Sequence, residues 1–282
     1  MPELPEVETV RRGLDQQVRG VRLEKVQVLR ERAIASPADP ELFRFALEGC
    51  EVGTWERRGK YLLATLRHDD GSAAGRWGVH LRMTGQFLWL EAPTPPCRHT
   101  RVRLHTTQGP ELRFVDTRSF GQMWWVPPGV ADQEVISGLT RLGPEPLEAG
   151  FDTFHLARGL QGTKRSIKSA LLDQSLVAGV GNIYADESLF AAGIHPLTPA
   201  GDLNEVQLAR IRDALVQVLE MSIGAGGTTF SDFRDLRGTN GNYGGMAWVY
   251  RRTGQPCRRC GTAIRRERVG GRSTHWCPNC QP

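Results

Sequence analysis

The second residue of the chain, Pro2, stands where it could act as a nucleophile. Prolines are common at helix starts because their missing N–H would have no partner there, and this accounts for Pro5. It does not account for Pro2, because the apolar spacing of the first helix begins only at Val7. Removal of Met1 would leave Pro2 as a free secondary amine. Since α-amines titrate at about 7.7–8.0, a neutral, nucleophilic fraction would exist at physiological pH.

Four cysteines near the carboxyl end have the spacing of a metal site. They form two C-x2-C pairs that are sixteen residues apart: Cys257, Cys260, Cys277 and Cys280. In a four-thiolate zinc site each pair supplies two ligands and the residues between the pairs form a hairpin. Disulfide pairing is disfavoured because a cytoplasmic compartment keeps thiols reduced. Four protein ligands leave no open position for water, so we expect one structural Zn²⁺.

The other two cysteines, Cys50 and Cys97, lie far from this cluster in the sequence and have no such spacing. We expect both to be buried structural residues.

The charge of the chain is concentrated at the same end. The whole sequence carries a net charge of +5, whereas residues 250–282 contain eight arginines and one acidic residue, Glu267, which gives this segment a charge of +7. The rest of the chain therefore sums to about −2. A basic end on a nearly neutral body indicates an anionic partner, and nucleic acid is the first candidate.

The sequence also argues against membrane insertion or secretion. No stretch approaches the roughly 20 apolar residues that span a bilayer. The acidic start lacks the basic and apolar regions of a secretory signal. We therefore expect a cytoplasmic protein.

The elements that must position these residues change type along the chain. After a first helix, for which Gly20 is a plausible end, short apolar runs are separated by Gly, Pro, Asp or Ser. These runs are "VRLEKVQVL", "KYLLATL", "WGVHLRMTGQFLWL", "HTRVRLHTT", "ELRFVDT" and "GQMWWV". Their spacing predicts a β-sandwich or barrel over residues 1–130, interrupted by one helix, "PELFRFALEG".

Beyond a proline- and glycine-rich linker at 131–150, the apolar period becomes helical. Segments "TKRSIKSALLDQ" and "IYADESLFAAG" flank a tight "AGVGN", and a long helix places Leu208, Ile211, Leu215 and Val218 on one face. We expect a helical domain over 151–246, a glycine-rich loop over 225–247 and a zinc finger over 247–282. The fold class is accordingly α+β and multidomain.

These motifs together resemble one family, the formamidopyrimidine-DNA glycosylases. The likeness runs from Pro2 to Gln281 and is carried by "PELPEVETVRRGL" at the start, "RRGKYLL" at 57–63, "DTRSFG" at 116–121, "LLDQSLVAGVGNIYADESLF" at 171–190 and "GRSTHWCPNCQ" at 271–281. The resemblance implies base excision repair: removal of 8-oxoguanine and ring-opened purines from double-stranded DNA, with cleavage at the abasic site. It also implies an N-terminal β-sandwich, a helix–two-turn–helix domain and a zinc finger. We expect a monomer in the cytoplasm, associated with the nucleoid during repair.

The resemblance also implies which residues are catalytic. The Pro2 amine attacks C1′ of the damaged nucleotide and forms a Schiff base, after which β- and δ-elimination cut the strand. Glu3 matches the general acid that opens the sugar; on its own it would be interpreted as an exposed glutamate in a first helical turn. Lys60 matches the lysine of the elimination steps, and Arg272 the arginine that binds phosphate at the tip of the zinc hairpin.

Further matches imply DNA contacts. By resemblance, three residues form a wedge: Phe120 enters a base step, Met83 occupies the space of the extruded base, and Arg118 hydrogen-bonds the orphaned cytosine. An isolated Met83 or Phe120 would more often belong to a core. The expected phosphate contacts are His99, Lys164, Lys168 and Asn182. Asn182 opens a helix, where N–H groups attract an anion; a plain N-cap is its alternative.

Departures from the family pattern leave the lesion preference open. Thr117 and Ser119 interrupt a motif that reads "DPRRFG" in many members, and Arg82 stands where many have glycine. The loop 225–247, which by position covers the extruded base, also differs. Two alternatives remain: an endonuclease VIII-like glycosylase for oxidised pyrimidines, and a non-catalytic, zinc-containing protein that binds damaged DNA.

Overall fold

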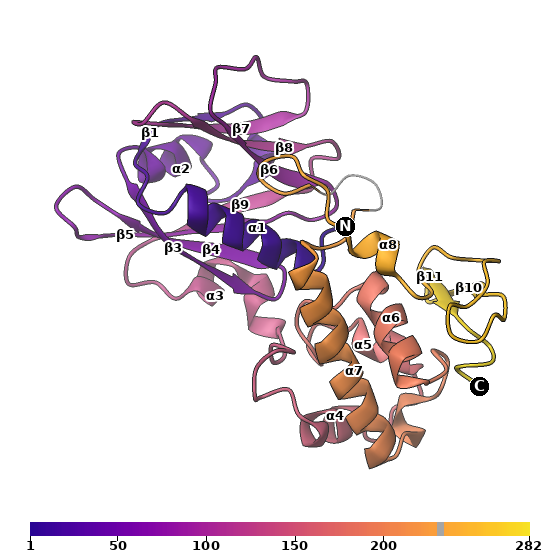
Figure 1. The fold of residues 1–282 in the computed structure, drawn as a ribbon. Helices are drawn as coiled ribbons and strands as arrows, with labels where there is room; N and C mark the ends of the chain where they lie inside the picture. The colour runs from indigo at the N-terminus through magenta and orange to yellow at the C-terminus, as the bar shows by residue number, and fades with distance from the viewer. Residues whose placement is uncertain (230–233) are drawn as a thin grey trace. The chain divides into compact units, whose positions relative to one another are not determined.

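The computed structural model describes residues 1–229 and 234–282 (Figure 1). The chain divides into two compact units. Residues 1–140 and 226–242 form the first unit, and residues 141–225 and 243–282 form the second. The break after residue 140 falls inside the linker expected at 131–150. Two groupings differ from the expected domains: residues 226–242 join the first unit, and the cysteine-rich end shares a unit with the helices.

The first unit contains two β-sheets and two longer helices. Its elements are α1 (Leu4–Gln17), β1 (Leu23–Val28), η1 (Glu31–Ala33), β2 (Ile34–Ser36), α2 (Pro40–Leu47), β3 (Glu51–Arg58), β4 (Tyr61–Arg67), β5 (Ala73–His80), β6 (Gly85–Leu90), β7 (Thr100–Thr106), β8 (Glu111–Asp116), β9 (Gln122–Val126), α3 (Asp132–Val135) and η2 (Ser137–Arg141). One sheet is antiparallel, in the order β1-β7-β8-β6. The other has the order β2-β9-β5-β4-β3, with only β2 and β9 parallel.

The core of this unit draws on both sheets and on helices α1 and α2. Strand β7 alternates buried and half-buried residues, the pattern of a strand with one face toward a core. The rings of Trp77 on β5 and Phe87 on β6 meet edge to face at 5.9 Å and so join the two sheets. Helix α1 contributes Val7, Val10 and Leu14. The expected β-sandwich is therefore confirmed.

Local differences from the expected elements have physical causes. The run 77–90 supplies parts of two strands in different sheets, β5 and β6, and Arg82 in the turn between them adopts a left-handed conformation with φ +53°. Strand β3 was not expected, since of its eight residues only Val52 and Trp55 are buried. Helix α1 ends at Gln17, earlier than Gly20, which turns the chain with φ +78°.

Helices dominate the second unit. It contains α4 (Thr153–Leu160), α5 (Ile167–Leu171), α6 (Asn182–Ala192), η3 (Ala200–Asp202), α7 (Glu205–Gly224), α8 (Tyr243–Met246), β10 (Arg265–Val269) and β11 (Arg272–Trp276). Helix α7 begins at a capping box: Asn204 Oδ1 accepts from Gln207 N, and Gln207 Oε1 accepts from Asn204 N. The four apolar residues predicted to share a face of α7 are all buried.

Around the cysteines, β10 and β11 form an antiparallel hairpin, as the spacing of the two C-x2-C pairs predicts (Figure 1). A small core of Phe190, Val249, Cys257, Ile264 and Cys277 joins this hairpin module to α6. The helix expected from "TKRSIKSALLDQ" is shorter than its sequence indicates and covers only α5.

The two isolated cysteines differ from each other. Cys50 is buried, and its Sγ donates to the carbonyl of Ala46, so its prediction is confirmed. The prediction for Cys97 is wrong, because Cys97 is exposed. It lies in the proline-rich segment 91–99, between β6 and β7, where no strand carries it into the core.

Candidate functional site

The amino terminus leads into a buried turn of helix α1. Pro2 is buried, Glu3 is 3% exposed, and Met1 before them is exposed. Glu3 N donates to Glu6 Oε2 at 2.8 Å. The interpretation of Glu3 as an exposed first-turn residue is therefore wrong. Glu3 belongs instead to the buried start of α1, directly after Pro2.

Glu6 connects this turn to a distant segment of the same unit. Its Oε1 accepts from Thr228 N at 2.8 Å, while its Oε2 holds the backbone of Glu3. Gly227 packs so closely that a Cβ there would lie 3.1 Å from Glu6 Oε1. The segment 226–229, at the start of the loop expected to cover the base, is thus attached to the residues beside Pro2. The expected role of that loop also involves residues 230–233, which lie outside the described part of the chain.

Lys60 lies in the two-residue turn between β3 and β4 and is 8% exposed. Gly59 before it adopts φ +55°, which a turn this tight requires. Arg57 donates to the carbonyl of Gly59 at 3.2 Å and pairs with Glu8 of helix α1 at the same distance. Through Arg57, the helix that begins beside Pro2 also orients the turn that carries Lys60.

His80 is a candidate that sequence reasoning missed. It is buried at the end of β5, its Nδ1 accepts from Arg82 N at 2.9 Å, and its ring meets the ring of Tyr61 at 4.6 Å. Burial, together with the cations of Arg82 and Lys60, lowers its pKa to about 3. His80 is therefore a neutral imidazole next to Lys60 at physiological pH. The only signal in the sequence was its place three residues before Met83.

The three residues expected to form the wedge are all at the surface. Met83 is 36% exposed and Phe120 is 40% exposed, so neither belongs to the core. The Arg118 guanidinium lies 5.0 Å from the centroid of the Phe120 ring. Exposed apolar side chains held on turns of a sandwich are available to enter a base step.

Asp116 holds the two turns that carry these residues. It is buried; its Oδ1 accepts from Thr84 Oγ1 and Arg118 N, and its Oδ2 accepts from Gly121 N at 2.7 Å. One carboxylate therefore fixes the turn 81–84 and the turn 117–121 relative to each other. Asp116 is part of the motif "DTRSFG", although the sequence alone assigned it no role.

The expected phosphate contacts have different surroundings. His99 is half-buried and its Nε2 accepts from Arg98 Nε at 2.9 Å, whereas Lys164 is exposed before α5. Asn182 is the first residue of α6, and the cap is Gly181, so the alternative of Asn182 as a plain N-cap is wrong. Its Nδ2 donates to the carbonyl of Ser273 at 2.9 Å.

Lys168 is not available at the surface. Its side chain is 1% exposed and its Nζ lies 2.6 Å from Asp186 Oδ1. The same Nζ donates to Ser273 O and Thr274 Oγ1. A phosphate contact requires an exposed ammonium, and the structure instead places this one in a buried ion pair beside β11. The periodicity of a short helix did not reveal which face Lys168 occupies.

Arg272 is exposed at the tip of the hairpin, as expected. Gly270 and Gly271 form the turn before it, with φ +54° and +79°, the paired left-handed conformations of a tight hairpin. The strand opposite, β10, is exposed almost throughout and carries Arg265, Arg266 and Arg268. The hairpin therefore presents guanidinium groups to solvent, which suits an anionic partner.

The four clustered cysteines fit a tetrahedral ion. Their Sγ atoms all lie within 4.8 Å of one another, with 3.9 Å between Cys257 and Cys280 and 3.4 Å between Cys260 and Cys277. Ligands at about 2.3 Å from Zn²⁺ would be about 3.8 Å apart. Hydrogen bonds from the Thr262 hydroxyl and backbone lower the pKa of Cys260, whereas burial raises the pKa of Cys277 and of Cys280.

Comparison with known proteins finds matches for all three parts of the chain: the N-terminal part, the helical part and the cysteine-rich end. Three family models match in order: the formamidopyrimidine-DNA glycosylase N-terminal domain over residues 1–123, its H2TH domain over 142–234, and the zinc finger found in FPG and IleRS over 254–282. A formamidopyrimidine-DNA glycosylase of Parasynechococcus marenigrum is 64% identical over the full length of both chains, and one of Prochlorococcus marinus is 62% identical. The chain belongs to the formamidopyrimidine-DNA glycosylase family.

Solved structures of this glycosylase family agree with the fold. A complex of a Lactococcus lactis FPG mutant with DNA containing Fapy-dG has a TM-score of 0.89 at 33% identity, with 99% of each chain covered. A Lactococcus lactis Fpg complex with DNA containing an abasic site gives the same values. A MutM complex with DNA containing carbocyclic 8-oxo-G has a TM-score of 0.87 at 34% identity over both full chains. The chain is accordingly a DNA glycosylase of base excision repair with one zinc-binding site.

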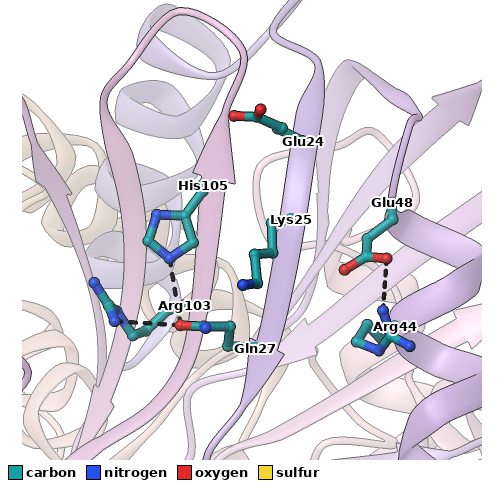
Figure 2. A pocket seen from close by; sticks show the side chains of 7 residues that line it. All are labelled: Glu24, Lys25, Gln27, Arg44, Glu48, Arg103 and His105. Carbon is teal, nitrogen blue, oxygen red and sulfur yellow. Dashed lines mark hydrogen bonds and ion pairs between the residues drawn. The ribbon is translucent and has the colours of Figure 1, made fainter.

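A separate cavity of about 710 Å³ lies in the first unit (Figure 2). None of the residues predicted for the glycosylase site lines it. Its lining is formed by Glu24, Lys25, Gln27, Arg44, Glu48, Arg103 and His105. Arg44 pairs with Glu48 at 2.7 Å, and Arg103 donates to Gln27 at 3.2 Å. These two cations therefore already have partners within the lining.

The described residues of this glycosylase family member include no helix with the length and apolar character needed to cross a bilayer.

Proposed function

We propose that the chain removes oxidised purines, namely 8-oxoguanine and formamidopyrimidines, from double-stranded DNA and then cuts the strand at the resulting abasic site. The observation that carries this proposal is the buried start of α1, where Pro2 and Glu3 lie in the same unit as Lys60. The relatives crystallised with Fapy-dG, 8-oxo-G and abasic DNA support the substrate class.

The chemistry begins at the Pro2 nitrogen once Met1 has been removed. The amine lone pair attacks C1′ of the damaged nucleotide, and the bond from C1′ to the base breaks with the electron pair leaving on the base. The proton lost from the Pro2 nitrogen is taken up by the departing base. The protonated Glu3 carboxyl donates to the sugar ring oxygen, so that the ring opens and an iminium links C1′ to Pro2. The iminium then acidifies the C2′ protons, because it can accept the electron pair left behind.

Strand cleavage follows by elimination. Loss of a C2′ proton expels the 3′ phosphate, which is the β-step, and a second proton loss expels the 5′ phosphate, which is the δ-step. Lys60, beside the neutral His80, is the proposed participant in proton transfer, and Arg272 the proposed phosphate ligand. Hydrolysis of the remaining iminium returns the free Pro2 amine. We place this activity in the cytoplasm, at the nucleoid.

Borohydride trapping tests this proposal because it reduces the iminium to a stable covalent adduct. We expect duplexes with 8-oxoguanine or a formamidopyrimidine to be trapped at least about tenfold faster than a duplex with an oxidised pyrimidine. A preference for the pyrimidine would support the endonuclease VIII-like alternative. Binding of damaged DNA without any adduct would support the non-catalytic one.

The proposed wedge gives a prediction of its own. Phe120→Ala should slow excision of paired 8-oxoguanine about tenfold, because stacking of an aromatic ring on a base contributes about 1–3 kcal/mol. Cleavage at a pre-formed abasic site should stay close to the wild-type rate, since no base has to be extruded there. Single-turnover rates on the two duplexes measure the difference.

Phe45→Ala is the matched control, because Phe45 is an exposed phenylalanine on α2 of the same unit. It should leave both rates unchanged. Equal losses on the two substrates in Phe120→Ala would contradict the wedge role.

A further inference from the structure

The strand that begins with Arg272 is held by two side chains from the helices of the second unit. Lys168 Nζ, on α5, donates to Ser273 O at 2.7 Å and to Thr274 Oγ1 at 2.8 Å. Asn182 Nδ2, at the start of α6, donates to the same Ser273 carbonyl at 2.9 Å. Ser273 directly follows Arg272, so both contacts act on the backbone next to the exposed guanidinium.

Asp186 completes this arrangement from the middle of α6. Its carboxylate is fully buried; Oδ1 lies 2.6 Å from Lys168 Nζ, and Oδ2 accepts from His275 N at 2.9 Å. The His275 ring lies 3.0 Å from the same Oδ2. Asp186 therefore fixes the ammonium that holds Ser273 and also holds β11 directly, three residues after Arg272.

We propose that Asp186 and Lys168 are positioning residues that orient Arg272 by fixing the start of β11. This proposal rests on the function proposed above for Arg272. In the described part of the chain the Arg272 guanidinium has no hydrogen-bond or ion-pair partner of its own. The turn before it consists of two glycines, which restrict the backbone least. The direction of the side chain therefore depends on how firmly residues 273–275 are anchored.

A different residue, Glu187 of α6, attaches the hairpin module that contains the four cysteines. The buried Glu187 carboxylate accepts from the backbone N–H groups of Trp248, Val249 and Tyr250 at 2.8–2.9 Å. It thereby holds the segment that leads into the first cysteine pair. The small core around Phe190 adds apolar contacts to the same attachment. Loss of Asp186 should consequently leave the module folded while Arg272 loses its orientation.

The test removes both charges together, because a single substitution would leave an unpaired charge in the interior. The double variant Asp186→Asn with Lys168→Met is compared with wild type on a duplex that carries a pre-formed abasic site. Single-turnover measurement of the β- and β,δ-elimination products separates the two steps. We expect the δ-step to slow about tenfold, since misplacement of a phosphate ligand by about 1 Å has effects of this order or larger. The zinc content and the amount of borohydride-trapped adduct should match wild type.

Adding Arg272→Lys to the double variant gives a triple variant whose δ-step rate distinguishes a role through Arg272 from a purely structural role. If the pair acts through Arg272, the triple variant should be no slower in the δ-step than Arg272→Lys alone. The matched control replaces an exposed ion pair of α7, Arg212→Met with Asp213→Asn, and should leave the product ratio unchanged.

The proposal would be overturned if the triple variant slowed the δ-step by the product of the separate effects of the pair and of Arg272→Lys. It would also be overturned if the double variant kept the wild-type product ratio, or if the double variant lost its zinc. Absence of any trapped adduct in the wild-type protein would instead overturn the function proposed for the site, and with it the role of Arg272.

Discussion

An alanine inserted between Met1 and Pro2 should abolish the covalent adduct with damaged DNA. In this variant the Pro2 nitrogen becomes part of a peptide bond, and its lone pair is no longer available to attack C1′. The new terminal amine is displaced by one residue, about 3.8 Å along the chain. Because displacement of a reacting group by about 1 Å can already cost about 100-fold, we expect trapping and base excision to fall at least that much.

The structure explains why the position of the terminal amine should matter so much. Pro2 is buried, and the residue that follows it is fixed through the hydrogen bond from Glu3 N to Glu6. An amine that precedes Pro2 therefore lies outside the geometry that α1 enforces. Intact-mass spectrometry should show Met1 absent from the wild-type protein, and peptide mapping after borohydride should place the adduct on Pro2.

Pro5→Ala is the control for this experiment. Pro5 lies in the first turn of α1, so its loss perturbs the start of the helix slightly and leaves the terminal amine in place. It should keep adduct formation within a few-fold of wild type. An adduct mainly on Lys60, or full activity in the alanine insertion, would refute the role of Pro2.

Elements with a clear apolar period could be predicted from the sequence. The apolar faces of α1 and α7 are buried as their spacing indicates. Strand β3 could not be predicted in this way, because its polar residues outnumber Val52 and Trp55 and its place in the sheet depends on pairing with β4. Pairing between strands is a tertiary property that local spacing does not contain.

The residues predicted for the site show the same limit. The four cysteines meet as predicted because ligand spacing is itself the signal. Lys168 was misassigned because neither its residue type nor its motif reveals whether its ammonium faces solvent. In the fold it is buried against the carboxylate of Asp186, eighteen residues later in the sequence. Asp116 and His80 were missed for a related reason, since their importance lies in the turns and cations that the fold brings around them. The roles of Pro2, Glu3 and Lys60 in catalysis stay predictions until they are tested.

Arg272→Lys should retain much of the affinity for DNA and strongly slow the δ-step of strand cleavage. Lysine preserves the positive charge, and counterion release depends on charge, so binding and its salt dependence should change little. The planar guanidinium can donate to two phosphate oxygens at once, which an ammonium cannot do in the same fixed geometry. Loss of one charge-assisted hydrogen bond is worth about 1.5–3 kcal/mol, which corresponds to about 10- to 100-fold in the rate of the δ-step.

Arg265→Ala separates this geometric role from simple charge. Arg265 is exposed on β10 of the same hairpin, so its removal takes away one positive charge without touching the tip. It should weaken binding modestly, lower the salt dependence by about one phosphate contact and leave single-turnover cleavage unchanged. If Arg272→Lys cleaves at the wild-type rate, or if Arg265→Ala slows cleavage equally, the hairpin contributes charge alone and the guanidinium geometry at its tip has no special part in the reaction.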